Sequence, residues 1–89
     1  MTDARIGPPP GSVRALELDG DISLYDAVTR QALMLNGTAS DIWRLADGAH
    51  TLAELTGLLA TAYGVPAERI RTEVEHTVRT LVEAGFLPG

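Results

Sequence analysis

The sequence predicts a small α+β domain with a winged-helix-like order, in which a three-stranded antiparallel sheet is followed by three α-helices. Two observations support this fold class. Short runs of β-forming residues separated by turn signals fill the first part of the chain, and the rest carries apolar residues at helical spacing between helix start and stop signals. The 89 residues suffice for one domain with a thin core.

The N-terminal segment does not fit a regular element. Residues 7–11 read Gly-Pro-Pro-Pro-Gly, which suits neither a helix nor a central strand. We therefore expect residues 1–11 to form a flexible Pro/Gly-rich arm that precedes a single domain over residues 12–89.

Three strands are expected after this arm. They cover residues 13–18, 22–25 and 31–35. Asp19-Gly20-Asp21 supplies the first turn, because aspartates bond their own backbone and glycine adopts positive φ. In the third strand, alternation directs Leu33 and Leu35 toward the core. The pattern is that of an antiparallel meander.

The first helix is expected to start at Thr38, whose side chain would cap it, with Asp41 at the third helical position. Gly48 is expected to end it. Trp43, the sole tryptophan, lies among the apolar residues of this helix, and its large area indicates a structural role in the core.

The second and third helices have clearer signals. Thr51 and Glu54 form a capping box at the start of the second, and Gly64 ends it. Pro66 suits the first turn of the third helix, because no amide donor is needed there. Gly85, followed by a phenylalanine, is typical of a Schellman stop.

One shoulder of the third helix mixes apolar and charged residues. Its apolar residues span an arc of about 120°: Ala67, Ile70, Val74, Val78, Leu81 and Val82. Arg71 lies within that arc and Glu75 just outside it. Periodicity alone leaves two interpretations, a solvated face with an i,i+4 ion pair or a groove wall with an apolar base and a charged lip.

Composition argues against several function classes. The chain has no cysteine, which excludes disulfides and thiolate metal sites, and its net charge of −5 disfavours nucleic acid as a partner. No apolar stretch reaches membrane-spanning length, and the N-terminus lacks a signal-peptide pattern. We expect a cytoplasmic protein without a membrane partner.

Catalytic and metal-binding patterns are also missing from the sequence. His50 and His76 have no ligand spacing typical of a metal site. Ser12, Ser23 and Ser40 do not lie in a nucleophile elbow. We therefore expect no enzyme activity, no metal and no cofactor.

An ordered set of motifs runs from the third strand to the end of the chain. It consists of Leu-Met-Leu-Asn at 33–36, Thr-Ala-Ser-Asp-Ile-Trp at 38–43, Asp-Gly at 47–48, Thr-Leu-Ala-Glu-Leu at 51–55, Tyr-Gly-Val at 63–65 and Leu-Val-Glu-Ala-Gly-Phe-Leu at 81–87. Over roughly residues 16–88 this order resembles the PqqD-like family, also called RiPP recognition elements. The resemblance implies a non-catalytic domain that holds the leader of a ribosomally made precursor peptide and presents it to a modifying enzyme.

The resemblance also implies where the leader binds. In this family the leader adds as a further strand to the edge of the third strand and is held against the last helix, which is β-augmentation. The implied leader-binding residues are Gln31, Ala32, Leu33, Met34 and Leu35 on the strand, and Arg71, Val74, Glu75, Val78 and Val82 on the helix. The chain departs from the family pattern at Arg30, where glycine is usual, and at Ala32 and Leu33, where aromatic residues are common.

As a single domain the chain would be a stand-alone adaptor with two partners, a precursor peptide and a modifying enzyme. The enzyme would be a radical S-adenosylmethionine protein, as in quinone-cofactor pathways, or a leader peptidase, as in lasso-peptide pathways. Two other classes stay open: a winged-helix DNA-binding regulator that uses Arg69, Arg71 and Arg79, and a structural subunit of an enzyme complex.

Overall fold

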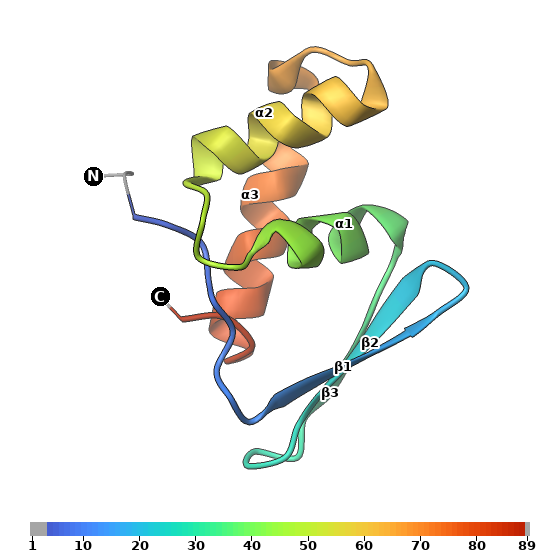
Figure 1. Ribbon diagram of the computed structural model, residues 1–89, viewed down its shortest axis with the longest axis vertical. Coiled ribbons are helices and arrows are strands. Elements are labelled where there is room, and N and C mark those ends of the chain that lie inside the picture. Colours follow the sequence, from blue (N-terminus) through green and yellow to red (C-terminus); the bar gives the residue numbers. More distant parts are fainter. Residues whose placement is uncertain (1–3, 89) are drawn as a thin grey trace.

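The computed structural model describes residues 4–88 and has the predicted α+β architecture. Its elements are β1 (Val13–Leu18), β2 (Asp21–Asp26), β3 (Ala32–Leu35), α1 (Gly37–Leu45), α2 (Leu52–Tyr63) and α3 (Ala67–Glu83). The strands form one antiparallel sheet in the order β1-β2-β3. The three helices lie together on one side of this sheet (Figure 1). None of the helices within residues 4–88 combines the length and the apolar character needed to cross a membrane.

Two tight turns set the register of the sheet. Asp19 and Gly20 both have positive φ, +54° and +85°, which matches the twist of a two-residue hairpin between Leu18 and Asp21. In the second turn Arg30, a non-glycine residue, adopts φ +65°. A non-glycine residue in this conformation costs about 1–2 kcal/mol, so the rest of the turn must hold it in place.

The buried Asp26 carboxylate organises that second turn. Its Oδ1 accepts hydrogen bonds from the Val28 amide at 2.8 Å and the Thr29 amide at 3.3 Å. The Val28 bond is the main reason that the pKa of Asp26 lies below its usual value. The charged form of Asp26 therefore stabilises the connection that leads into β3.

The predicted start of α1 is wrong by two residues. The cap is Asn36, whose Oδ1 accepts from the Ala39 amide at 2.8 Å, and the helix begins at Gly37 rather than after Thr38. Because Asn36 follows β3 directly, the helix starts as soon as the strand ends. The helix also ends earlier than predicted, at Leu45, while Gly48 lies in the following loop.

The other helix ends follow the predictions. The Thr51 hydroxyl accepts from the Glu54 amide at 3.2 Å and the Glu54 carboxylate accepts from the Thr51 amide at 2.9 Å, which is the predicted capping box. Gly64 ends α2 with φ +70°. The Phe86 amide donates to the Leu81 carbonyl at 2.9 Å, as a Schellman stop requires.

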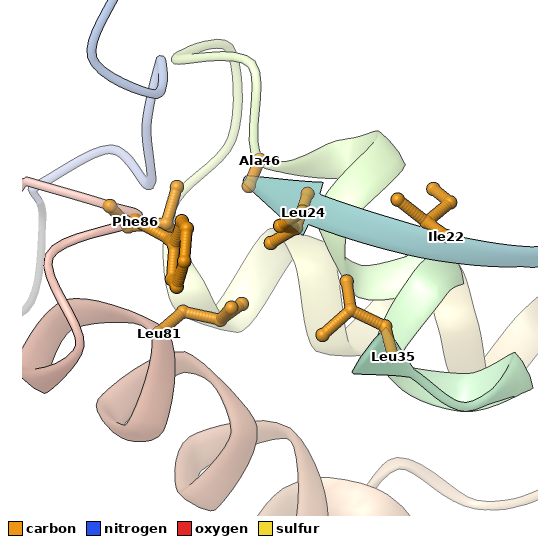
Figure 2. Close-up of a cluster of buried hydrophobic side chains, with 7 residues drawn as sticks. Ile22, Leu24, Leu35, Ala46, Leu81 and Phe86 are labelled. Carbon is orange, nitrogen blue, oxygen red and sulfur yellow. The ribbon is translucent and has the colours of Figure 1, made fainter. Parts of the chain in front are cut away.

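The hydrophobic interior consists of two clusters. The sheet cluster lies between the sheet and the C-terminal end of α3 (Figure 2), and it contains Ile22, Leu24, Leu35, Ala46, Leu81, Phe86 and Leu87. The helical cluster lies among the three helices and contains Ile42, Leu55, Leu59, Ala60, Ile70, Val74 and Val78. Trp43 packs against the sheet cluster but is only partly buried, so it contributes less to the core than its size suggests.

The N-terminal segment, which the sequence predicts to be a flexible arm over residues 1–11, has specific contacts from Arg5 onward; residues 1–3 lie outside the described residues. The Ile6 amide donates to the His50 carbonyl and the Gly48 amide donates to the Ile6 carbonyl, both at 2.8 Å. The Arg5 guanidinium donates to the Ala49 carbonyl at 2.6 Å. The Ile6 side chain packs against both hydrophobic clusters. The segment therefore runs beside the connection between α1 and α2 (Figure 1).

Candidate functional site

The two outer edges of the sheet differ in how they are protected. On β1, the Glu17 side chain shares a face with buried Ile22 and pairs with Arg44 of α1 at 2.9 Å, and an inward charge of this kind discourages further strand pairing. Arg14 also donates to the Val13 carbonyl at 3.3 Å. By contrast, β3 contains only Ala-Leu-Met-Leu, with neither a charge nor a proline. It is the unprotected edge of the sheet.

The register shows which backbone groups of β3 face that open edge. The Asp26 amide donates to the Gln31 carbonyl at 2.9 Å, so this pair is hydrogen-bonded. Hydrogen-bonded and non-hydrogen-bonded pairs alternate in an antiparallel ladder, so Leu33 and Leu35 direct their backbone groups to β2. The amides and carbonyls of Ala32 and Met34 consequently point away from the sheet, where another strand can bond to them.

A hollow of about 190 Å³ separates β3 from α3. Its lining comprises Leu33, Met34, Leu35, Asn36, Ala39, His76, Thr77, Thr80 and Leu81. Leu35 and Leu81 are buried and Leu33 and Ala39 are half-buried, so the hollow has an apolar floor. The helix side of its rim is polar, formed by His76, Thr77 and Thr80. An extended peptide paired with β3 would lie over this floor with alternate side chains directed toward α3.

Ser40 of α1 connects the strands to the helix beneath the hollow. It is fully buried, its Oγ accepts a hydrogen bond from the Ile22 amide at 2.9 Å, and it donates to the Leu35 carbonyl at 3.4 Å. The ends of β2 and β3 are thereby tied to α1. Nothing in the sequence indicates this role for Ser40, because a lone serine near a helix start looks like part of a cap.

Asp41 also has a different role from the predicted one. Instead of completing a capping box, its carboxylate accepts from Arg44 at 2.7 Å and from the Tyr63 hydroxyl. Burial, together with the hydrogen bond to Asp41, raises the pKa of Tyr63 to about 12. This contact joins the end of α2 to the middle of α1.

The strand residues of the predicted site lie along the open edge of the sheet. Leu33, Met34 and Leu35 line the hollow, Ala32 begins β3, and Gln31 immediately precedes the strand. Met34 is 80% exposed on the outer face of the sheet, so it reaches the hollow only at its margin. The structure therefore brings this set together at one edge.

None of the helix residues of the predicted site lines this hollow. Val74 and Val78 are buried in the helical cluster, and Val82 packs against both clusters. Arg71 and Glu75 border a separate hollow of about 320 Å³ between α2 and α3. The apolar arc of α3, which includes Val74 and Val78, is the stripe that packs onto the other helices, because α3 reaches the sheet cluster only near its end. Periodicity identified this buried stripe and not the face toward β3.

Neither histidine belongs to a metal centre in the described part of the chain. His76 lies on the rim of the hollow, whereas His50 lies in the connection before α2. No group of three or more histidine or acidic residues within residues 4–88 is placed to hold a metal ion.

Comparisons with known proteins agree with this architecture. Residues 21–87 match the family described as Coenzyme PQQ synthesis protein D (PqqD). No curated protein matches the sequence. Two solved structures have the same fold. TbiB1 in complex with the TbiA(beta) leader peptide has a TM-score of 0.81 at 20% identity, covering 91% of this chain and 94% of that chain.

The second structure, lasso peptide synthetase B1 complexed with the leader peptide, has a TM-score of 0.76 at 24% identity, covering 92% of this chain and 96% of that chain. At these identities the two structures establish the shared fold. The sequence match over residues 21–87 covers most of the chain and establishes the family. The chain therefore belongs to the PqqD family.

Proposed function

We propose that this protein is a non-catalytic adaptor that binds the leader of a ribosomally made precursor peptide as a fourth strand on β3. The observation that carries this proposal is the unprotected edge of β3, which faces the polar rim of α3 across an apolar floor. Backbone bonds to Ala32 and Met34 would supply affinity, and the hollow would accept leader side chains. Both solved structures with this fold are described as complexes with leader peptides, which supports the same class of ligand.

The backbone geometry gives a sharp test of strand addition. Met34→Pro removes an amide that faces the open edge and donates no hydrogen bond in the ladder with β2, so the sheet should tolerate it. The matched control is Ala15→Pro on the other edge. Because Asp26 bonds toward β3, the alternating pattern directs the Ala15 amide away from β2 as well.

Titration of a labelled cognate leader into the purified protein, followed by fluorescence anisotropy, measures the effect. We expect micromolar or tighter binding by the parent and by Ala15→Pro, and about tenfold weaker binding by Met34→Pro, the effect of losing a hydrogen bond to the ligand. Circular dichroism checks that both variants are folded. Absence of parent binding below millimolar concentrations, or equal binding by both proline variants, would contradict strand addition at β3.

We further propose that the second partner is a modifying enzyme that acts on the bound precursor, either a radical S-adenosylmethionine protein or a leader peptidase. The family description in coenzyme PQQ synthesis supports the first class and the likeness to a lasso peptide synthetase subunit supports the second. Reconstituting each enzyme type encoded beside this chain with the precursor, with and without this protein, distinguishes them. Product formation that needs the adaptor identifies the partner, and equal turnover without it contradicts the adaptor role.

The balance of charges on α3 does not favour DNA binding. Its exposed surface carries Glu68, Glu73 and Glu83 among its arginines, and the protein has a net charge of −5. We expect negligible binding of duplex DNA at physiological salt in a mobility-shift assay. Specific nanomolar binding to a promoter fragment would instead favour a regulator.

A further inference from the structure

The hollow between β3 and α3 has an unusual lining for so acidic a protein. The chain has 12 aspartates and glutamates, yet none of those within residues 4–88 lines this hollow. The polar lining groups are Asn36, His76, Thr77 and Thr80. All four can donate hydrogen bonds, and the Asn36 oxygen is already engaged in capping α1, which leaves its amide nitrogen for other partners. The lining is thus rich in donors and free of competing carboxylates.

His76 is the sole titratable residue in this lining. It is exposed, and it makes neither a side-chain hydrogen bond nor an ion pair within residues 4–88, where both ion pairs belong to Arg44. The nearest charged residues along α3 are Glu73, Glu75 and Arg79. The lining residues contributed by β3 and α1 are uncharged. Both ring nitrogens of His76 are therefore available to a bound peptide.

We propose that His76 is a specificity-determining residue that pairs with an acidic side chain of the leader, so that leader binding strengthens as His76 becomes protonated. The inference rests on the proposed leader site and adds the chemistry of one leader position. A carboxylate directed at α3 would accept from the donors of the rim without meeting a fixed negative charge there. Protonated imidazole would convert one of these bonds into a charge-assisted one.

The test compares leader affinity at about pH 7.5 and about pH 5.5, which bracket the usual range of histidine titration. Leader histidines are replaced by glutamine, so that those of the protein alone titrate. We expect the parent to bind about fivefold more tightly at the lower pH, the effect of a partly exposed charged pair. His76→Gln keeps a donor but not the charge and should lose this gain. His50→Gln is the matched control and should keep the gain, because His50 does not line the hollow.

Replacing each acidic leader residue in turn by its amide identifies the partner, because one such leader should lose the same gain with the parent protein. Three outcomes would overturn the inference while leaving leader binding established: a pH gain that persists in His76→Gln, tighter binding at the higher pH, or no single leader carboxylate that matters. A leader that does not bind at either pH removes the proposed function itself, and this inference with it.

Discussion

Ser40→Ala tests how the sheet is joined to the helical layer. The change removes the oxygen that accepts a hydrogen bond from the Ile22 amide at 2.9 Å, and this amide lies in a buried part of the sheet. A buried donor left without a partner destabilises a protein by about 1–3 kcal/mol. The weaker 3.4 Å contact between the Ser40 hydroxyl and the Leu35 carbonyl is also lost. We therefore expect a loss of about 2 kcal/mol in the free energy of unfolding.

That loss is large for a domain of this size, whose total stability is expected to be roughly 4–13 kcal/mol. Thermal unfolding followed by circular dichroism should show Tm lowered by roughly 8–16 °C. Ser23→Ala is the control, because Ser23 lies on the outer face of the sheet and should change stability by less than about 0.5 kcal/mol. If Ser40→Ala melted with the parent, the buried amide must have another partner, and the proposed link between sheet and α1 would be wrong.

Three further predictions concern stability. Trp43→Ala should lower the free energy of unfolding by about 2 kcal/mol. This is less than the roughly 3–5 kcal/mol typical of a fully buried aromatic residue, because the Trp43 side chain is only partly buried. A urea melt measures the change, and an unchanged midpoint would contradict the prediction. Gly7→Ala should be clearly destabilising, because Gly7 has φ +84° and an added Cβ would overlap the Ala46 carbonyl. In the control Gly11→Ala the added Cβ meets no atom within 4 Å, so this variant should melt like the parent. Equal melting temperatures for the two variants would show that the N-terminal segment is not docked. The hydrogen bond from the Thr51 amide keeps the pKa of Glu54 below its usual value, so the contribution of this carboxylate to stability is complete above the unfolded pKa and is lost as pH falls through the folded pKa. In urea melts between about pH 6 and pH 3, the parent should therefore lose more unfolding free energy than Glu54→Gln. Parallel pH curves for the two proteins would refute this.

The fold was largely predictable because its signals are local. The turn at Asp19 and Gly20, the capping box at Thr51 and the stop at Gly85 depend on neighbouring residues, and each occurs in the structure as the sequence indicates. The start of α1 was misplaced because Asn36 and Thr38 are both good caps, and the position of β3 decides between them.

Sequence reasoning placed only part of the residues around the hollow. The edge position of the third strand was implied by the resemblance, and the structure has β3 at an edge of the sheet. The face of α3 across the hollow depends instead on which stripe of the helix packs inward, and two stripes compete for that role. In the sequence, His76 and Thr80 look like ordinary solvated residues, although they line the hollow. The apolar arc of α3 looks like a binding surface, although Val78 in it is buried among the helices. Packing of α3 against elements distant in the sequence determines which of its faces borders the hollow.

The division of the interior into two clusters has a consequence for local motion. Within residues 4–88, Ile6 and Val82 are the two partly buried side chains that pack against both clusters, so few apolar contacts couple the sheet cluster to the helical cluster. Segments that share few contacts open as separate cooperative units. A peptide strand added beside Leu33 and Leu35 would contact the sheet cluster and not the helical cluster. We therefore expect amide hydrogen exchange to slow in β2 and β3 when a peptide binds, while the amides of α2 exchange at nearly their original rate.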